Sequence, residues 1–213
     1  FHNASESTLV NTSTMKKELR NLKFTNLIEW TRGVDKEIFK PTYDKKIRGL
    51  MNPENKKKVI LYVGRISKEK NLINLCKLSK KNHHHQFVLV GDGPLKKKLI
   101  NQFPKIIFPG YKFGNELAKY YSSADCSVFP SKNDTFGNTI LESISCGTPV
   151  AGYPVNGPVD IIKNNISGYT DEDLSIAISN SLNCDGNKVV NSIDKFTWDE
   201  CFKIFEKSIS KLI

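Results

Sequence analysis

The sequence predicts an α/β protein with a doubly wound parallel sheet, because three observations agree. From residue 57 onward, short and almost wholly apolar runs alternate with amphipathic stretches. Runs without polar alternation are typical of parallel strands that helices cover on both faces. The chain has 213 residues, of which 38% are hydrophobic, so it can build a core and is not globally disordered. No apolar run approaches the ~20 residues that a membrane-spanning helix needs.

The N-terminal segment, residues 1–41, predicts only a small unit. It is expected to contain a strand at 8–11, a helix at about 14–22 and a strand at 27–30. About 40 residues do not bury an independent core, so we expect the remnant of a larger N-terminal domain. Residues 42–56 are polar, charged and interrupted by Pro53, which favours an interdomain linker.

Residues 57–194 are expected to form the sheet domain. Apolar runs predict strands at 57–63, 87–90, 106–108, 126–129 and 149–151. Helical spacing predicts helices at 71–80, 95–103, 115–122, 137–146 and 158–163. The last segment, 195–213, is expected to be a helix with one apolar face, and this face would pack back toward the N-terminal domain. That face consists of Phe202, Phe205 and Ile209.

The positive charge of the chain is a weak guide to its partners. The formal net charge is +10, but it comes from 28 Lys and only 4 Arg, alongside 20 Asn and 20 Ile. Lys, Asn and Ile share A/T-rich codons, so drift in base composition explains most of the charge. The Lys clusters lie at predicted element edges without interleaved aromatics, so no nucleic-acid partner is expected. Contact with an anionic membrane surface stays open. Because Arg is so rare in this chain, Arg32 and Arg65 are candidate positions at which a bidentate guanidinium is needed and Lys would not serve.

Cysteine and histidine usage indicates a reducing compartment and no metal site. The 5 Cys are scattered and form no C-x-x-C pair, which favours a cytoplasmic location. The run His83-His84-His85 is expected to be a loop, since three consecutive residues on a turn do not converge on one ion. Asp171 and Asp173 precede an apolar periodic segment, so we expect them to cap a helix.

Three loops follow predicted strands and carry chemically distinctive side chains. In a parallel sheet, ligands bind beyond the carboxyl ends of the strands. In the loop 64–71, Arg65 and Lys70 could clamp a diphosphate between them. The loop 131–139 leads into a helix whose free N–H groups suit an anion. The turn Gly91-Asp92-Gly93-Pro94 is expected beside them.

Two acids flank the start of the helix predicted at 137–146. Glu142 lies one to two turns inside it, roughly 9 Å from its first residue at 1.5 Å per residue, and Asp134 lies in the loop before it. Acids on either side of a phosphate-binding helix start can hold hydroxyls at both ends of a diphosphate. A nucleotide sugar has this layout of ribose, two phosphates and sugar.

The motifs in order resemble glycosyltransferase family 4, the retaining nucleotide-sugar enzymes of the GT-B fold, which has two Rossmann-like domains. The segment from Asp134 to Glu142 resembles the E-x7-E region of that family, with Asp134 one methylene shorter than the usual Glu. The Asp-Thr-Phe-Gly form is most similar to the α-mannosyltransferase and glycolipid glycosyltransferase branch. Other matching pieces are Arg32-Gly33-Val34-Asp35, Gly64-Arg65 with Glu69-Lys70, Gly91-Asp92-Gly93-Pro94, Ser123-Ala124-Asp125, Ser145-Cys146-Gly147-Thr148-Pro149-Val150 and Gly157-Pro158-x-Asp160.

The resemblance implies a role for each site residue. Arg65 and Lys70 would neutralise the donor diphosphate, Asp134 would contact the transferred sugar, and these three would be the catalytic residues. Glu142 would hold the ribose hydroxyls. The remaining donor-binding positions would be Gly64, Phe136, Gly137, Asn138 and Thr139.

The resemblance also implies the reaction. A hexose, mannose-like, would pass with retention to a lipid or glycan acceptor, without a metal or other cofactor and without a protein nucleophile. The protein would be cytoplasmic, with peripheral contact to the inner face of the membrane. The chain would be about half of a two-domain enzyme, able to bind donor and incomplete for catalysis.

Other functions stay open from the residues alone. A sugar-nucleotide epimerase or a phosphorylase of similar architecture binds comparable ligands, and a non-catalytic nucleotide-binding module needs the same loops. A dehydrogenase is not expected, because Gly91-x-Gly93 lacks the third Gly of a dinucleotide fingerprint, with Lys96 in its place.

Overall fold

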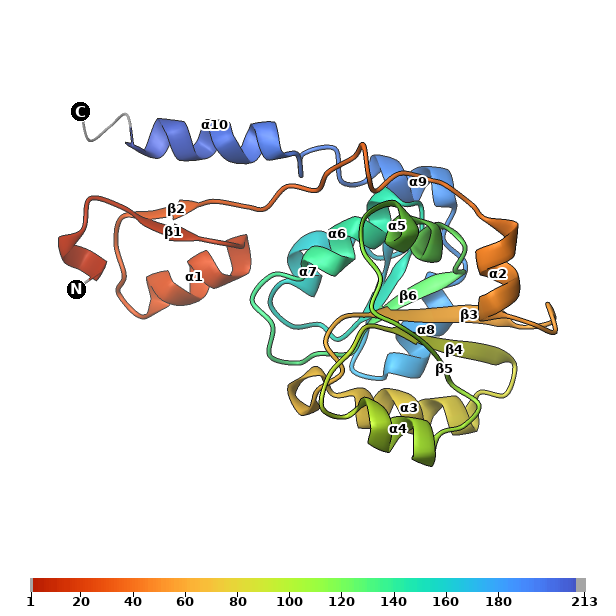
Figure 1. Cartoon of the computed structure of the whole chain (residues 1–213). Coiled ribbons are helices and arrows are strands. Elements are labelled where there is room, and N and C mark those ends of the chain that lie inside the picture. Colours follow the sequence, from red (N-terminus) through yellow and green to blue (C-terminus); the bar gives the residue numbers. More distant parts are fainter. Residues whose placement is uncertain (1, 210–213) are drawn as a thin grey trace.

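The computed structural model describes residues 2–209. A small N-terminal unit lies beside a larger sheet domain, and the C-terminal helix returns across the small unit (Figure 1). Part of the predicted C-terminal segment, residues 210–213, lies outside the described residues. No helix within residues 2–209 combines the length and hydrophobicity that a membrane crossing requires.

The sheet domain contains a six-stranded parallel sheet, which confirms the predicted fold class. Its order is β5-β4-β3-β6-β7-β8, so the chain builds outward from β3 and then crosses back to place β6 on its other side. β8 was not predicted, because its residues Gly168, Tyr169 and Thr170 do not form an apolar run. The strands are β3 (Lys58–Val63), β4 (His85–Val90), β5 (Ile107–Gly110), β6 (Cys126–Phe129), β7 (Val150–Gly152) and β8 (Gly168–Thr170).

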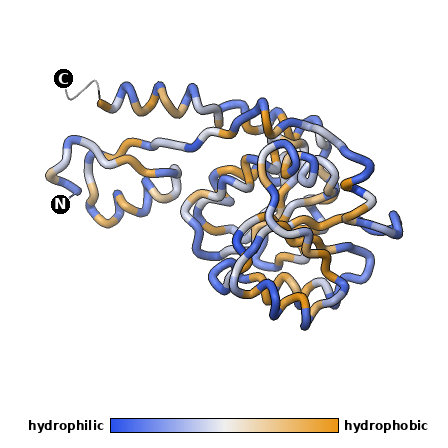
Figure 2. The backbone as a smooth tube through the Cα atoms, in the orientation of Figure 1, coloured by the Kyte–Doolittle hydropathy of each residue, from blue (hydrophilic) through white to orange (hydrophobic). Residues whose placement is uncertain are grey.

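Helices cover both faces of this sheet. The apolar run in β3 places Ile60 and Tyr62 in one core cluster and Val59 and Leu61 in another, and all four are buried. Figure 2 shows the central strands as hydrophobic segments enclosed by more hydrophilic ones. One face packs on α3 (Leu72–Lys81), α4 (Lys96–Gln102) and α8 (Leu174–Ser181). The other packs on α2 (Lys45–Met51), α5 (Gly114–Ser122), α6 (Asn138–Ser145) and α9 (Gly186–Asn191).

The predicted linker, residues 42–56, contains helix α2. Asp44 caps it by accepting from the backbone N–H groups of Lys46 and Ile47. Met51 at its end is fully buried against the strands of the sheet domain. Arg48 donates to Asp125 at 2.6 Å and to the carbonyl oxygen of Ser123, which fixes α2 to the start of β6. The division of the chain into domains stays a prediction.

The N-terminal unit consists of a parallel strand pair with a helix on one side and the C-terminal helix on the other. Trp30 Nε1 donates to the carbonyl oxygen of Cys201 at 3.0 Å, and its ring lies 5.7 Å from that of Phe205. The C-terminal helix therefore packs on this unit (Figure 1), but the face predicted for this contact is wrong: Cys201 and Ser208 are buried, whereas Phe202 and Ile209 are exposed and Phe205 is only partly covered. The elements are η1 (His2–Ala4), β1 (Thr8–Val10), α1 (Ser13–Asn21), β2 (Leu27–Glu29) and α10 (Trp198–Ile209).

One carboxylate joins the N-terminal unit to the sheet domain. Asp160, in α7 (Pro158–Ile161), accepts from Ser13 Oγ at 2.7 Å, from Thr14 N at 3.0 Å and from Thr14 Oγ1 at 2.9 Å. Burial alone would raise the pKa of Asp160, but the hydrogen bonds from Ser13 and Thr14 lower it overall. The start of α1 is therefore held against the sheet domain, two residues after Asn11, which lines the cavity described next.

Candidate functional site

A cavity of about 320 Å³ lies at the carboxyl ends of β3 and β6 and is also lined by the N-terminal unit. It lies at the switch point of the strand order, where open α/β sheets bind ligands. We call it the phosphate cavity. It brings together the predicted site residues Gly64, Arg65, Lys70, Asp134, Phe136, Gly137, Asn138 and Thr139, but not Glu142.

The turn at residues 91–94 supports the loop that follows β3. Gly91 has φ of +138°, and a Cβ there would lie 1.9 Å from the carbonyl oxygen of Gly64, so only glycine fits. Ile66 N donates to the carbonyl oxygen of Asp92 at 2.8 Å, which links the two loops. The turn therefore lies beside the phosphate-cavity loop, as predicted.

Lys70 and Asp134 form an ion pair across the phosphate cavity. Lys70, at the end of η2 (Lys68–Lys70), places its Nζ 2.6 Å from Asp134 Oδ2. The side chains are 31% and 21% exposed, so solvent screens the pair only in part. Asn71 follows in a left-handed conformation, φ +56°, and its Nδ2 donates to the carbonyl oxygen of Pro130 at 3.1 Å. An incoming anion would have to share Lys70 with Asp134.

The start of α6 contributes uncompensated hydrogen-bond donors. Gly137, at φ +97°, precedes the helix, and the first backbone N–H groups of an α-helix have no partner within it. Ser131 Oγ, on the preceding loop, is buried and has no hydrogen-bond partner among the described residues. Both features suit an anionic ligand in the phosphate cavity, which Ser131 and Gly137 line.

Glu142 lines a second cavity of about 500 Å³ instead. Tyr121 Oη donates to Glu142 Oε2 at 2.9 Å. Burial raises the pKa of Glu142, and the hydrogen bond from Tyr121 opposes this rise. Gly64, Arg65 and Thr139 line both cavities, so the two adjoin.

The second cavity, which we call the aromatic cavity, carries an exposed ring pair at its rim. The rings of Tyr111 and Phe113 stack with centroids 6.1 Å apart, and each side chain is 70% exposed. Neither residue was expected from the sequence to belong to the site. The available signal was two aromatics on either side of Lys112, directly after the strand that ends at Gly110.

The charges around the phosphate cavity favour an anion. Arg32, Arg65 and Lys70 contribute three cations and Asp134 one carboxylate, so the lining has a formal charge of 3 − 1 = +2. Arg32 comes from the N-terminal unit and was not assigned a role from the sequence beyond its bidentate shape. Its position across the cavity depends on tertiary packing.

The two weaker sequence motifs have structural roles. Asp173 accepts from Ser175 N at 2.8 Å and caps α8, as predicted, whereas Asp171 accepts from Asp173 N at 2.8 Å and does not reach the helix. His83 and His84 lie in a turn, and His85 begins β4.

Comparisons with known proteins bear on the family and the fold. The family model described as glycosyl transferases group 1 matches residues 44–179. A GDP-mannose-dependent alpha-mannosyltransferase of Corynebacterium glutamicum is 36% identical over 168 residues, covering 78% of this chain and 40% of the relative. An alpha-monoglucosyldiacylglycerol synthase of Streptococcus pneumoniae is 31% identical over 151 residues, covering 65% of this chain and 34% of the relative.

A solved structure supports the fold. Sucrose-phosphate synthase from Thermosynechococcus elongatus superposes with a TM-score of 0.83 at 22% identity, covering 99% of this chain and 59% of that one. The chain spans about two fifths or less of the length of these two curated relatives.

Proposed function

The chain belongs to the glycosyl transferases group 1 family, and from this premise we propose that it is the donor-binding part of a retaining hexosyltransferase. The observation that carries the proposal is the phosphate cavity. There Arg65, Lys70 and the start of α6 face one space at the switch point of the sheet. Two cations and a helix N-terminus match the charge and the acceptor oxygens of a diphosphate.

The adjoining cavities match the two halves of a nucleotide sugar. We place the diphosphate in the phosphate cavity and the nucleoside in the aromatic cavity. Glu142 would accept hydrogen bonds from the ribose hydroxyls, and the base would lie against Tyr111 and Phe113, since aromatic faces stack well on bases. Asp134 would turn from Lys70 toward the hydroxyls of the sugar.

The chemistry that this arrangement supports is stabilisation of a leaving group. The bond from the anomeric carbon to the phosphate oxygen breaks, and its electron pair goes to that oxygen. Arg65, Lys70 and the start of α6 line the phosphate cavity, so they would stabilise the charge that develops there once Asp134 releases or shares Lys70. The acceptor hydroxyl would attack from the face that the diphosphate leaves, which retains the configuration, and its proton would pass to the departing phosphate oxygen.

The relatives guide the finer assignment of donor and acceptor. A relative named for GDP-mannose supports mannose as the transferred sugar, and a relative named for a diacylglycerol product supports a lipid acceptor. A lipid acceptor would place the protein in the cytoplasm at the inner face of the membrane. Glycan acceptors belong to the same proposal.

Calorimetric titration with GDP, UDP and ADP, and with GDP-mannose and UDP-glucose, tests the donor site. We expect one nucleoside diphosphate to bind, and Lys70→Gln to weaken it at least tenfold, because a charge-assisted contact is lost. Lys68→Gln is the matched control, since Lys68 lies on the same turn, is exposed and does not line the phosphate cavity. Absence of binding by all three diphosphates, or equal effects of the two variants, would contradict the proposal.

A further inference from the structure

We propose that Arg32 is a third cation of the donor site, supplied by the N-terminal unit, and that its guanidinium binds the terminal phosphate of the nucleoside diphosphate. The proposal rests on the proposed donor site. It assigns a donor contact to a part of the chain outside the sheet domain. Donor binding would then depend on how the N-terminal unit is held against that domain.

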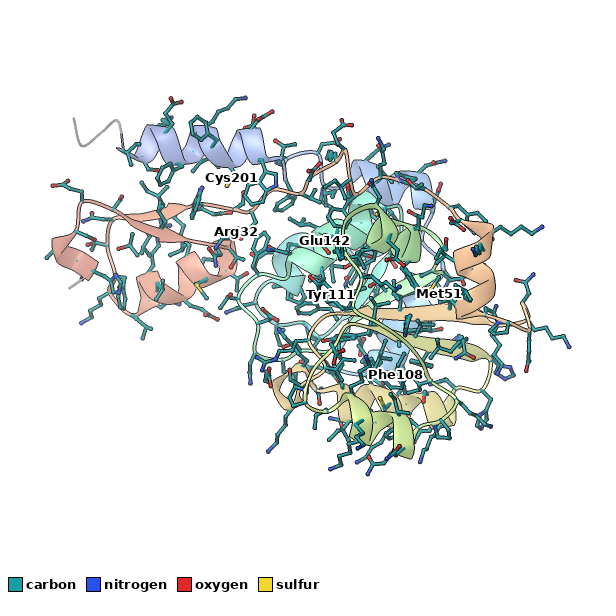
Figure 3. All side chains as sticks on the ribbon, in the orientation of Figure 1. Arg32, Met51, Phe108, Tyr111, Glu142 and Cys201 are labelled. Carbon is teal, nitrogen blue, oxygen red and sulfur yellow. The ribbon has the colours of Figure 1, made fainter. Side chains whose placement is uncertain are left out.

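The position of Arg32 is the first support. Arg32 is half-buried and lines the phosphate cavity together with Arg65 and Lys70, and it does not line the aromatic cavity. Figure 3 shows Arg32 on the N-terminal unit, on the side that faces the sheet domain. A ligand that fills the phosphate cavity therefore lies between Arg32 and the two cations of the sheet domain.

The side chain of Arg32 is held in place by an aromatic ring and not by a carboxylate among residues 2–209. Its guanidinium carbon lies 5.1 Å from the centre of the Trp30 ring, a cation–π contact. Trp30 is fixed in turn by its hydrogen bond to Cys201 and its contact with Phe205. Within residues 2–209, no carboxylate forms an ion pair with Arg32. A stacked guanidinium keeps the N–H groups of its edge available to an anion.

The backbone around Arg32 is anchored to the C-terminal segment. A Cβ on Gly33 would lie 2.4 Å from the backbone N of Trp198, so the chain passes that segment at the closest approach glycine allows. Val34 N donates to the carbonyl oxygen of Phe196 at 3.0 Å. The N-terminal unit is therefore held at two places. Asp160 binds the start of α1, and the C-terminal segment contacts the backbone next to Arg32.

The charge of the leaving group is the last support, because Arg65 and Lys70 would neutralise it only in part. A terminal phosphate released from the sugar carries about −1.5 to −2 charges at pH 7, more than the bridging phosphate of the intact donor. Lys70 is already paired with Asp134. The other cation of the sheet domain that lines the phosphate cavity is Arg65. A bidentate guanidinium from the opposite wall matches the terminal phosphate oxygens.

Calorimetry on Arg32→Gln tests the proposal, with GDP and GMP, and in parallel UDP and UMP, as probes. We expect the diphosphate that binds the wild type to bind Arg32→Gln at least tenfold more weakly, and the matching monophosphate to lose less than threefold. Arg20→Gln is the matched control, because it makes the same charge change on an exposed side chain of the same unit, away from the phosphate cavity. We expect it to bind like the wild type.

The outcomes separate this proposal from the donor-site proposal. If Lys70→Gln loses the diphosphate and Arg32→Gln keeps it, Arg32 is not a donor contact and the donor site stands. If Arg32→Gln weakens the diphosphate and monophosphate equally, the contact to the terminal phosphate is wrong. If no diphosphate binds the wild type, both proposals are overturned.

Tryptophan fluorescence provides a second measurement that does not depend on how well Arg32→Gln folds. The chain has 2 Trp, so in a Trp198→Phe background the emission comes from Trp30, beneath the Arg32 guanidinium. Binding of the diphosphate is expected to shift this emission, and binding of the monophosphate to shift it less. An emission that stays constant while calorimetry shows saturation would overturn the proposal.

Discussion

Replacing Tyr121 by phenylalanine removes one hydroxyl from the interior of the sheet domain and changes the environment of Glu142. Tyr121 is fully buried, and its Oη donates to Glu142 Oε2 at 2.9 Å. The rest of the Tyr121 ring packs against Phe39 at a centroid distance of 6.2 Å, and phenylalanine keeps that contact. The substitution therefore isolates a single hydrogen bond to a partly buried carboxylate.

The expected cost depends on pH, because the hydrogen bond favours the charged form of Glu142. A hydrogen bond to a charged group contributes about 1.5–3 kcal/mol, and one between neutral groups about 0.5–1.5 kcal/mol. Burial already raises the pKa of Glu142 above the ordinary glutamate value of 4.5, and loss of the Tyr121 hydroxyl is expected to raise it further. Between pH 4.5 and the folded-state pKa, the folded chain binds more protons than the unfolded chain. Stability therefore falls as the pH rises through this window, and it falls further in Tyr121→Phe.

Thermal and urea unfolding from pH 4.5 to pH 8 measure this difference. At neutral pH we expect Tyr121→Phe to lose about 1.5–3 kcal/mol, or about 3–12 °C in Tm for a chain of this size. The deficit should shrink toward pH 4.5. Tyr120→Phe is the control, because Tyr120 is buried one residue earlier, with its ring 5.7 Å from Lys112 Nζ.

Two results would refute the reasoning. A deficit that does not vary with pH would show that Tyr121 stabilises the fold without acting on the charge of Glu142. An equal pH-dependent deficit in Tyr120→Phe would show that the effect belongs to α5 in general. If Glu142 binds the ribose, the pH at which nucleotide affinity is lost should also rise in Tyr121→Phe and not in Tyr120→Phe.

Three further predictions follow from single contacts. Met51→Ala should cost about 2–5 kcal/mol in urea unfolding, because Met51 is fully buried; a cost near zero would mean that α2 is not part of the core. Asp160→Asn should speed amide hydrogen exchange across α1 at neutral pH, because the helix loses its contact with the carboxylate. In the wild type, the protection of α1 from exchange should be lost as the pH falls below 3.8, since the hydrogen bond from Ser13 lowers the pKa of Asp160. Unchanged exchange in the variant would contradict the contact. Asp134→Asn should release Lys70 from its ion pair and raise the affinity for nucleoside diphosphates about tenfold in calorimetry, with a smaller gain in affinity for the sugar conjugate. Weaker diphosphate binding by this variant would refute the competition between Asp134 and the ligand for Lys70.

Much of the phosphate cavity was predictable because its residues lie close in sequence to strand ends. Arg65 and Lys70 follow β3 directly, and Gly137 to Thr139 begin a helix after β6. Since β3 and β6 are neighbours in a parallel sheet, their carboxyl ends meet at one edge. Local pattern and the rule for ligand position in such sheets were enough to place these residues together.

The ion pair between Lys70 and Asp134 and the contact between Tyr121 and Glu142 were not predictable. Lys70 and Asp134 are 64 positions apart, and their contact depends on the conformation of two loops. Glu142 was expected at the far end of a diphosphate from Asp134, and it lies in the adjoining aromatic cavity, but its hydrogen bond from Tyr121 was not expected. Helical spacing gives the distance along an axis and not the direction in which a side chain finds space.

The composition and periodicity of the sequence determined the sheet, its parallel arrangement, its two covered faces and the loops that carry the cations. These features depend on hydrophobic pattern and on turn chemistry, which are properties of neighbouring residues. Tertiary structure alone decided that α2 joins the core, that Asp160 holds α1, and that Arg32 and Arg65 line one cavity. Such contacts join segments far apart in the chain, and their positions are set by the packing of whole elements.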